Sequence, residues 1–223
     1  MNRGALAVSL ILLAQTLSAG EWVVGAEGDN RHTYTYISRI QRRPVRRGQE
    51  LVFAGTVSYL RYESGGLTVS SPGLGGSAEY RFFGPRYSFG AGAGYEVRYT
   101  ARRIAGASDS KIDHGPIALT DASFRIAQQT WISATGGYSV ANEWLAGNVQ
   151  LKQGLSPGLR VGAESGWQGN DDIRVRTQGG LVEVPAGSER SWLQFRAGTA
   201  TIRDRNGNEE RRPYYSFGIA RSF

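Results

Sequence analysis

Apolar and polar residues alternate with a period of two along most of the chain, as expected for strands that bury one face. The clearest stretch is RYSFGAGAGYEVRYT, residues 86–100. Its apolar face consists of Tyr87, Phe89, Ala91, Ala93, Tyr95, Val97 and Tyr99. The other face carries glycine, serine, threonine and charged residues. Helical periodicity is hard to find after the first 20 residues, so the pattern predicts an all-β protein.

Glycine and charge share the polar face of the predicted strands. In LRVGAESGW (159–167) and WLQFRAGTATI (192–202), apolar positions again alternate with charged residues and glycine. Alternation alone would also suit a soluble sandwich, but glycine weakens a strand and serves no purpose on a face that looks at open water. In a small membrane barrel the polar face looks inward, where space is tight and charges must pair. The pattern therefore favours a transmembrane barrel.

Turn signals divide the chain into twelve segments. We expect strands near 22–28, 32–40, 50–62, 66–83, 86–103, 115–127, 130–140, 143–153, 158–168, 173–184, 189–203 and 212–223. Bacterial barrels have an even number of antiparallel strands, with short periplasmic turns and longer outer loops. The prediction is one antiparallel up-and-down transmembrane β-barrel of twelve strands, with ten possible. Its long outer loops are 105–115 and 204–212.

The basic stretch 41–50 fits this arrangement poorly, because it forms a long connection on the inner side. An alternative treats 22–40 as one strand and breaks 66–83 at SPGLGG, which moves the basic stretch outside and keeps twelve strands. Treating both 22–40 and 66–83 as single strands gives eleven and puts the C-terminus on the wrong side of the membrane.

Both ends of the chain carry targeting patterns. Residues 1–19 combine Arg3 with an apolar run and a small-residue cleavage site, which predicts a secretory signal peptide, with residue 26 as an alternative end. The barrel is then residues 20–223. Its last strand ends in Phe223, which resembles the recognition signal of the outer-membrane assembly machinery. We therefore expect the outer membrane of a Gram-negative bacterium, with its lipid and this machinery as partners.

The tryptophans lie at the start or end of predicted strands. In a membrane barrel, amphipathic rings gather at the two membrane-water interfaces. We therefore expect an interfacial girdle made of Trp22, Trp131, Trp144, Trp167 and Trp192.

Composition narrows the chemistry of the chain. The formal charge is +7, and Lys111 and Lys152 are the only lysines. The arginines are scattered rather than clustered on one stripe, so we expect no nucleic-acid partner. Cysteine is absent, and no histidine or acidic residues have ligand spacing. We expect neither a metal nor a cofactor.

The charges on the polar faces are expected to line the lumen. They are Glu79, Arg81, Glu96, Arg98, Asp121, Arg125, Lys152, Arg160, Glu164, Arg174, Arg176 and Arg196. One interpretation is an ionic filling, in which the charges pair to offset their desolvation. The other is a lining for an anionic solute or polysaccharide, because a basic excess focuses the field in a low-dielectric channel.

An enzymatic alternative rests on the predicted outer rim. His32, His114 beside Asp113, and the pair Asp171 and Asp172 supply the residue types of an aspartate and histidine site. None of them lies in a recognisable motif. We therefore expect no catalytic residues and no enzyme, with an outer-membrane rim hydrolase kept as a further alternative.

Four runs resemble a known family: YLRYESGG (59–66), SPGLGGSAEYRF (71–82), GAGYEVRYT (92–100) and VGAESGWQGNDDIRVRTQGGL (161–181). Their order and spacing resemble the outer-membrane barrel family called cellulose biosynthesis protein BcsS, over roughly residues 50–185. Glu164, Gly169, Asp171 and Asp172 match its glutamate and acidic-loop pattern. The resemblance implies a small barrel that acts beside a bacterial cellulose synthase and export system without catalysis.

These observations predict a non-enzymatic accessory protein of exopolysaccharide (cellulose) biosynthesis or export. Its partners would be cellulose synthase or export components, or the polysaccharide itself. A small passive porin-like or structural barrel is the alternative.

Overall fold

The computed structural model describes residues 21–28, 32–64, 67–104, 107–141, 143–171, 173–186 and 191–221. These residues form twelve strands: β1 (Glu21–Gly28), β2 (His32–Arg46), β3 (Gln49–Ser64), β4 (Leu67–Phe83), β5 (Tyr87–Ile104), β6 (Ala107–Ala127), β7 (Thr130–Ser139), β8 (Trp144–Ser156), β9 (Leu159–Gly169), β10 (Ile173–Pro185), β11 (Ser191–Asp204) and β12 (Glu209–Arg221). The predicted signal peptide, residues 1–19, and Phe223 lie outside the described residues. No helix among the described residues is long and apolar enough to cross a membrane.

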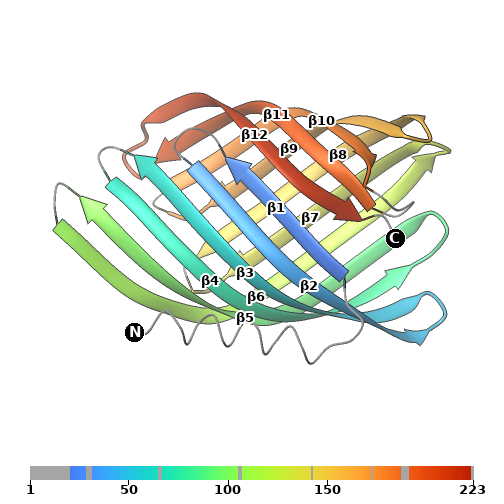
Figure 1. Cartoon of the computed structure of the whole chain (residues 1–223), viewed down its shortest axis with the longest axis horizontal. Helices are drawn as coiled ribbons and strands as arrows, with labels where there is room; N and C mark the ends of the chain where they lie inside the picture. The colour runs from blue at the N-terminus through green and yellow to red at the C-terminus, as the bar shows by residue number, and fades with distance from the viewer. Residues whose placement is uncertain are drawn as a thin grey trace.

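Every strand pairs antiparallel with its neighbours in the chain, and β1 pairs with β12 to close the sheet (Figure 1). This confirms the predicted antiparallel twelve-strand barrel. Within the described residues the closing seam is short, since it joins Gly25–Gly28 of β1 to Tyr215–Gly218 of β12. Both the start of β1 and the end of β12 lie at the end of the barrel that carries the turns 47–48, 84–86, 128–129 and 157–158. We call this the inner end and the opposite one the outer end.

The division into separate strands near 22–28 and 32–40, with 66–83 unbroken, is confirmed. Three expected connections are wrong, because strand pairing continues into them. β2 runs through the basic stretch to Arg46, with a bulge between Pro44 and Arg46. β6 begins at Ala107 and β12 at Glu209, so most of the two expected outer loops is paired strand. The charged residues of these stretches are therefore carried mostly on paired strands rather than on loops.

The two faces of the barrel differ as the alternation predicts. Outward-facing side chains form an exposed apolar belt that includes Val24, Ile37, Phe53, Leu74, Phe89, Val97, Phe124, Leu151, Val182, Phe195 and Phe217. On β12, Tyr215 and Phe217 face outward, while Tyr214 and Ser216 are buried on the lumen side. In lipid the backbone must satisfy its own hydrogen bonds, which a closed barrel with an apolar outer surface achieves.

A glycine pair brings β10 and β11 close together on the lumen side. Gly179 and Gly198 are in register. A Cβ on Gly179 would lie 2.3 Å from the Ala197 carbonyl oxygen, and one on Gly198 would lie 2.1 Å from the Gln178 carbonyl oxygen. Backbone atoms cannot move aside as a flexible side chain would, so only glycine fits this close approach.

We predict that Gly179→Val destabilises the barrel by at least about 2 kcal/mol, since the added methyl groups force the β10 and β11 backbones apart. The measurement is the urea midpoint of unfolding in lipid vesicles. The adjacent Gly180→Val is the control, because the atom nearest to its added Cβ, the Gly162 carbonyl oxygen, is 3.7 Å away. Equal midpoints for the two variants would contradict the role assigned to the glycine pair.

Candidate functional site

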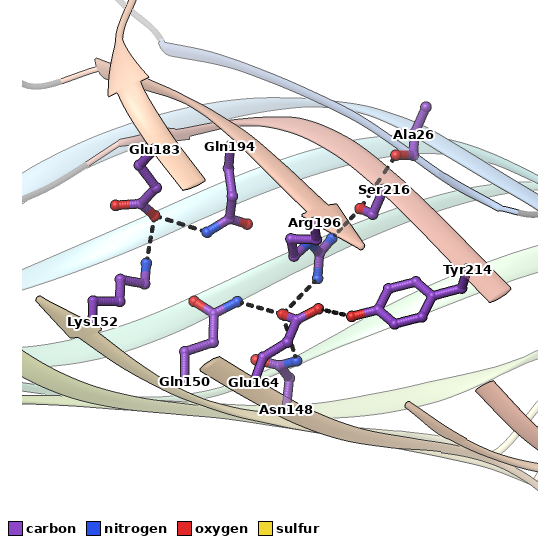
Figure 2. Close-up of polar contacts among 10 residues, drawn as sticks. All are labelled: Ala26, Asn148, Gln150, Lys152, Glu164, Glu183, Gln194, Arg196, Tyr214 and Ser216. Atoms are coloured by element: carbon purple, nitrogen blue, oxygen red, sulfur yellow. Dashed lines mark hydrogen bonds and ion pairs between the residues drawn. The ribbon is translucent and has the colours of Figure 1, made fainter. Parts of the chain in front are cut away.

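The most buried charged residue of the lumen, among the described residues, is Glu183 on β10, at 1% exposure. Lys152 Nζ on β8 donates to its Oε1 at 2.6 Å, and Gln194 Nε2 on β11 donates to the same oxygen at 2.8 Å (Figure 2). Arg160 on β9 lies opposite Glu183 in register, with its guanidinium 3.6 Å from Oε2. Two basic side chains from β8 and β9 and an amide from β11 thus surround one carboxylate on β10.

Two tryptophans hold Arg160 beside this carboxylate. The Arg160 guanidinium carbon lies 3.7 Å from the centroid of the Trp192 ring and 4.9 Å from that of Trp131. Arg125 approaches Trp131 at 5.7 Å. Such contacts are attractive because the ring faces are electron-rich. The group lines a lumen cavity of about 640 Å³ near the inner end.

A second carboxylate, Glu164 on β9, organises the middle of the barrel. It accepts hydrogen bonds from Tyr214 Oη, Gln150 Nε2 at 3.0 Å and Asn148 Nδ2 at 3.3 Å, and Arg196 lies 3.5 Å away (Figure 2).

Arg196 also ties this network to the closing seam. It donates to Ser216 Oγ at 2.6 Å, and Ser216 donates to the Ala26 carbonyl oxygen on β1 at 3.4 Å. The network around Glu164 therefore reaches across the junction of β12 and β1.

The opposite wall carries its own ion pairs. Arg81 on β4 pairs with Glu79 at 2.5 Å and with Asp121 on β6 at 2.6 Å. Towards the outer end, Arg98 pairs with Glu96 at 3.2 Å.

Side chains on other strands complete the outer half of the lumen. Ser139 on β7 donates to Glu96, and Arg98 donates to Ser58 on β3 at 3.5 Å. These groups line a second lumen cavity of about 350 Å³. The named pairs join strands at most three apart, so they follow the wall rather than bridge the lumen.

The structure places ten of the twelve expected lumen charges on the inward face. They are Glu79, Arg81, Glu96, Arg98, Asp121, Arg125, Lys152, Arg160, Glu164 and Arg196. Arg174 and Arg176 instead face outward, because alternation from the buried Leu181 and Glu183 puts even-numbered residues of β10 outside. The outer half of β10 reverses the usual pattern, with Ile173 and Val175 inward.

The tryptophans divide between the two faces. Trp22 and Trp167 face outward and are exposed. Trp131, Trp144 and Trp192 face the lumen, which differs from the expected girdle. Each lines a lumen cavity together with inward-facing polar residues. A position near a strand end indicates how far along the barrel axis a tryptophan lies, but it does not indicate whether the ring faces the lumen or the lipid.

The rim residues of the enzymatic alternative do not converge. His114 lies on the outward face of β6, where Nδ1 is 2.5 Å from Tyr95 Oη, whereas Asp113 pairs with Lys111 at 3.1 Å on the other face. Asp171 is 90% exposed in the β9–β10 turn and pairs with Arg174. Asp172 and the side chain of His32 lie outside what the structure describes. Within the described residues, no three His, Cys, Asp or Glu side chains are placed to hold a metal ion.

Sequence reasoning missed several members of the site. Glu183 and Gln150 were not among the expected lumen residues, although Glu183 could have been found from its parity with Leu181. Arg160 on β9 contacts Trp131 on β7 and Trp192 on β11. No local sequence pattern indicates that these three residues lie close together.

Comparison with known proteins supports the architecture. No protein-family model and no curated sequence matches the chain. The KdgM porin superposes with a TM-score of 0.52 at 10% identity, covering 90% of this chain and 99% of the porin. The β domain of the Bordetella autotransporter Brka gives 0.56 at 16% identity, covering 92% of this chain and 99% of that domain. The translocator domain of the autotransporter NalP from Neisseria meningitidis gives 0.55 at 9% identity, covering 99% and 95%.

At these identities the likeness shows the fold alone. The chain is an outer-membrane β-barrel of twelve strands, similar in fold to a porin and to autotransporter barrels. The resemblance to the cellulose family stays a prediction.

We predict that Glu164→Gln lowers the free energy of unfolding by about 1 to 3 kcal/mol, because it leaves the Arg196 charge without its carboxylate. The measurement is tryptophan fluorescence during urea unfolding in vesicles. Glu63→Gln is the matched control: its pair with Arg61, at 2.6 Å, is largely exposed, and its loss should cost less than about 1 kcal/mol. Adding Arg196→Gln to Glu164→Gln should recover part of the lost stability. If the losses of the two single variants simply add in the double variant, Glu164 and Arg196 do not stabilise the barrel as a pair.

Proposed function

We propose that the protein is a non-enzymatic conduit of the outer membrane whose lumen passes anionic solutes of the saccharide class. The observation that carries the proposal is the inner cavity, where basic side chains outnumber acidic ones and aromatic rings line the wall. The basic residues are Arg42, Arg81, Arg86, Arg125, Lys152 and Arg160, and the acidic ones are Glu50, Asp121 and Glu183.

The basic excess supports a preference for anions. Glu50, Asp121 and Glu183 are already held by Arg42, Arg81 and Lys152, at 2.5, 2.6 and 2.6 Å. Arg125 has no such carboxylate among the described side chains and lies exposed at the mouth. Fixed positive charge in a narrow low-dielectric passage raises the local concentration of anions.

The aromatic rings support a saccharide rather than a simple ion. Trp131 offers flat apolar surface beside arginine, which suits a sugar ring that bears an acidic group, and Trp192 lies buried beneath Arg160. The Trp192 indole Nε1 is buried and has no hydrogen-bond acceptor in the described part of the chain. A buried donor left unpaired is costly, and a passing hydroxyl or carboxylate would satisfy it.

We predict that Arg125→Gln with Arg160→Gln lowers the anion preference of the pore by at least about twofold, because two fixed charges leave the inner cavity. The measurement is the reversal potential of single pores in a planar bilayer under a salt gradient. Arg174→Gln with Arg176→Gln removes the same charge from the outward face and should shift the potential less. If bilayers that contain the folded protein stay non-conducting, the proposal that the protein is a conduit is wrong.

The second candidate is an accessory role in cellulose production. The observation that favours it is the position of segment 161–181, the longest run of the family resemblance: it supplies Glu164 at the centre of the lumen network. The segment also supplies much of β9 and β10 and the outer turn between them. In this case the passing saccharide would be the exported polymer.

For this second role we predict that deletion of the gene from a cellulose-producing strain removes most cell-surface cellulose, measured by binding of a cellulose dye. Wild type and Trp167→Ala should restore it, because Trp167 faces outward. The double variant Trp131→Ala with Trp192→Ala should not restore it, since the aromatic rings beside Arg160 are lost. Unchanged cellulose in the deletion strain would exclude the accessory role and leave the conduit proposal untouched.

A further inference from the structure

Four arginines cluster on the outward face of the barrel at its outer end. Arg174 and Arg176 come from β10, Arg203 from β11 and Arg211 from β12, and we call them the arginine tier. Arg174 is in register with Arg203. Thr201 is in register with both Arg176 and Arg211, so the tier occupies two adjacent rows across three neighbouring strands.

Few acidic groups oppose this charge. Asp171 lies 3.4 Å from Arg174, but both side chains are largely exposed, at 90% and 72%. Glu209 is in register with Arg203. Neither Arg176 nor Arg203 has a hydrogen-bond or ion-pair partner in the described part of the chain. Like charges directly opposite on paired strands are unfavourable, so the Arg174 and Arg203 pair is stabilised when an anion lies between them.

The height of the tier matches the membrane-water interface. Trp167 on β9 is in register with Arg176 and also faces outward, where its ring covers Gly147. A tryptophan at this position on a barrel marks the level of the lipid headgroups. Guanidinium groups at that level meet phosphates, which they bind with two parallel hydrogen bonds.

An apolar hollow lies on the same strands, closer to the middle of the membrane. It has a volume of about 750 Å³, and its outward lining includes Gly180, Val182, Phe195, Ala197, Tyr215 and Phe217. Gly180, Ala197 and Tyr215 form one row in register, above a row of Val182, Phe195 and Phe217. The two small residues make the recess, and the rings flank it.

The spacing of the two features suits one amphipathic molecule. Gly180 lies four positions after Arg176, which is about 13 Å along an extended strand and less along the membrane normal because the strands tilt. Gln178 and Thr199 lie between the tier and the hollow, so the surface changes gradually from charged to polar to apolar.

We propose that the outward face of β10–β12 binds one phosphorylated lipid of the outer leaflet, with its phosphate groups on the arginine tier and an acyl chain in the hollow. The two features are continuous, and each complements one end of such a lipid. The site is independent of what passes through the lumen.

The test uses the folded full barrel in detergent and bisphosphorylated lipid A as the probe, with bound lipid counted by native mass spectrometry. Arg176→Gln, Arg203→Gln and Arg211→Gln together should weaken lipid A binding by about tenfold or more, since each charged hydrogen bond lost is worth about a tenfold change. Arg43→Gln, Arg46→Gln and Arg47→Gln remove the same charge from exposed positions at the inner end. This control should bind lipid A as the unchanged protein does.

Two further arms separate the lipid from its parts. Dephosphorylated lipid A should bind the unchanged protein no better than lipid A binds the triple variant, and inorganic phosphate should not displace lipid A. Ala197→Phe fills the hollow while keeping every arginine, and it should also weaken binding, which keeps the test valid if the triple variant fails to fold. Equal binding by the triple variant and its control, or full displacement by inorganic phosphate, would overturn the proposal.

Discussion

The backbone hydrogen bonds of the β1–β12 seam are the constraint on which the rest of the structure depends. In hydrocarbon an open sheet edge leaves donors and acceptors that no water reaches, so the sheet must close on itself. Among the residues that the structure describes, four of each strand make this closure. Side chains reinforce that short junction from within, since Ser216 links Arg196 on β11 to the Ala26 carbonyl oxygen on β1.

Closure also decides where the charges go. Because the outer surface of the belt must be apolar, acidic and basic side chains along the spans share the lumen, where each carboxylate gathers donors from several strands. Glu183 and Glu164 are the two clearest cases, one near the inner end and one near the seam. The same groups that hold the wall together leave a basic surplus facing the inner cavity. Stability and the proposed selectivity therefore rest on one set of residues.

Periodicity was enough to predict the barrel, its strand number and the lumen position of charges such as Arg81 and Glu164, because facing follows from parity once one residue is anchored. It failed where the surroundings of a strand change along its length. Arg174 and Arg176 face outward because the buried Leu181 and Glu183 fix the parity of β10, so that its outer end carries the arginines outside and Ile173 inside. The prediction for Trp131 and Trp192 was wrong for another reason. Their partner, Arg160, lies two strands away from each of them, and such proximity depends on the curvature of the barrel rather than on a local sequence pattern.

The uneven height of the wall affects how these barrels behave when they are packed closely in a membrane. β6 pairs with β5 from Ala107 onward but meets β7 only from Ile117, so its outer stretch is an unpaired edge in the described structure. A bare edge is a template on which a second molecule can add its own sheet. The sequence places Asp109, Lys111 and Asp113 along this edge. Charged residues on such an edge make pairing with the sheet of a neighbouring copy unfavourable.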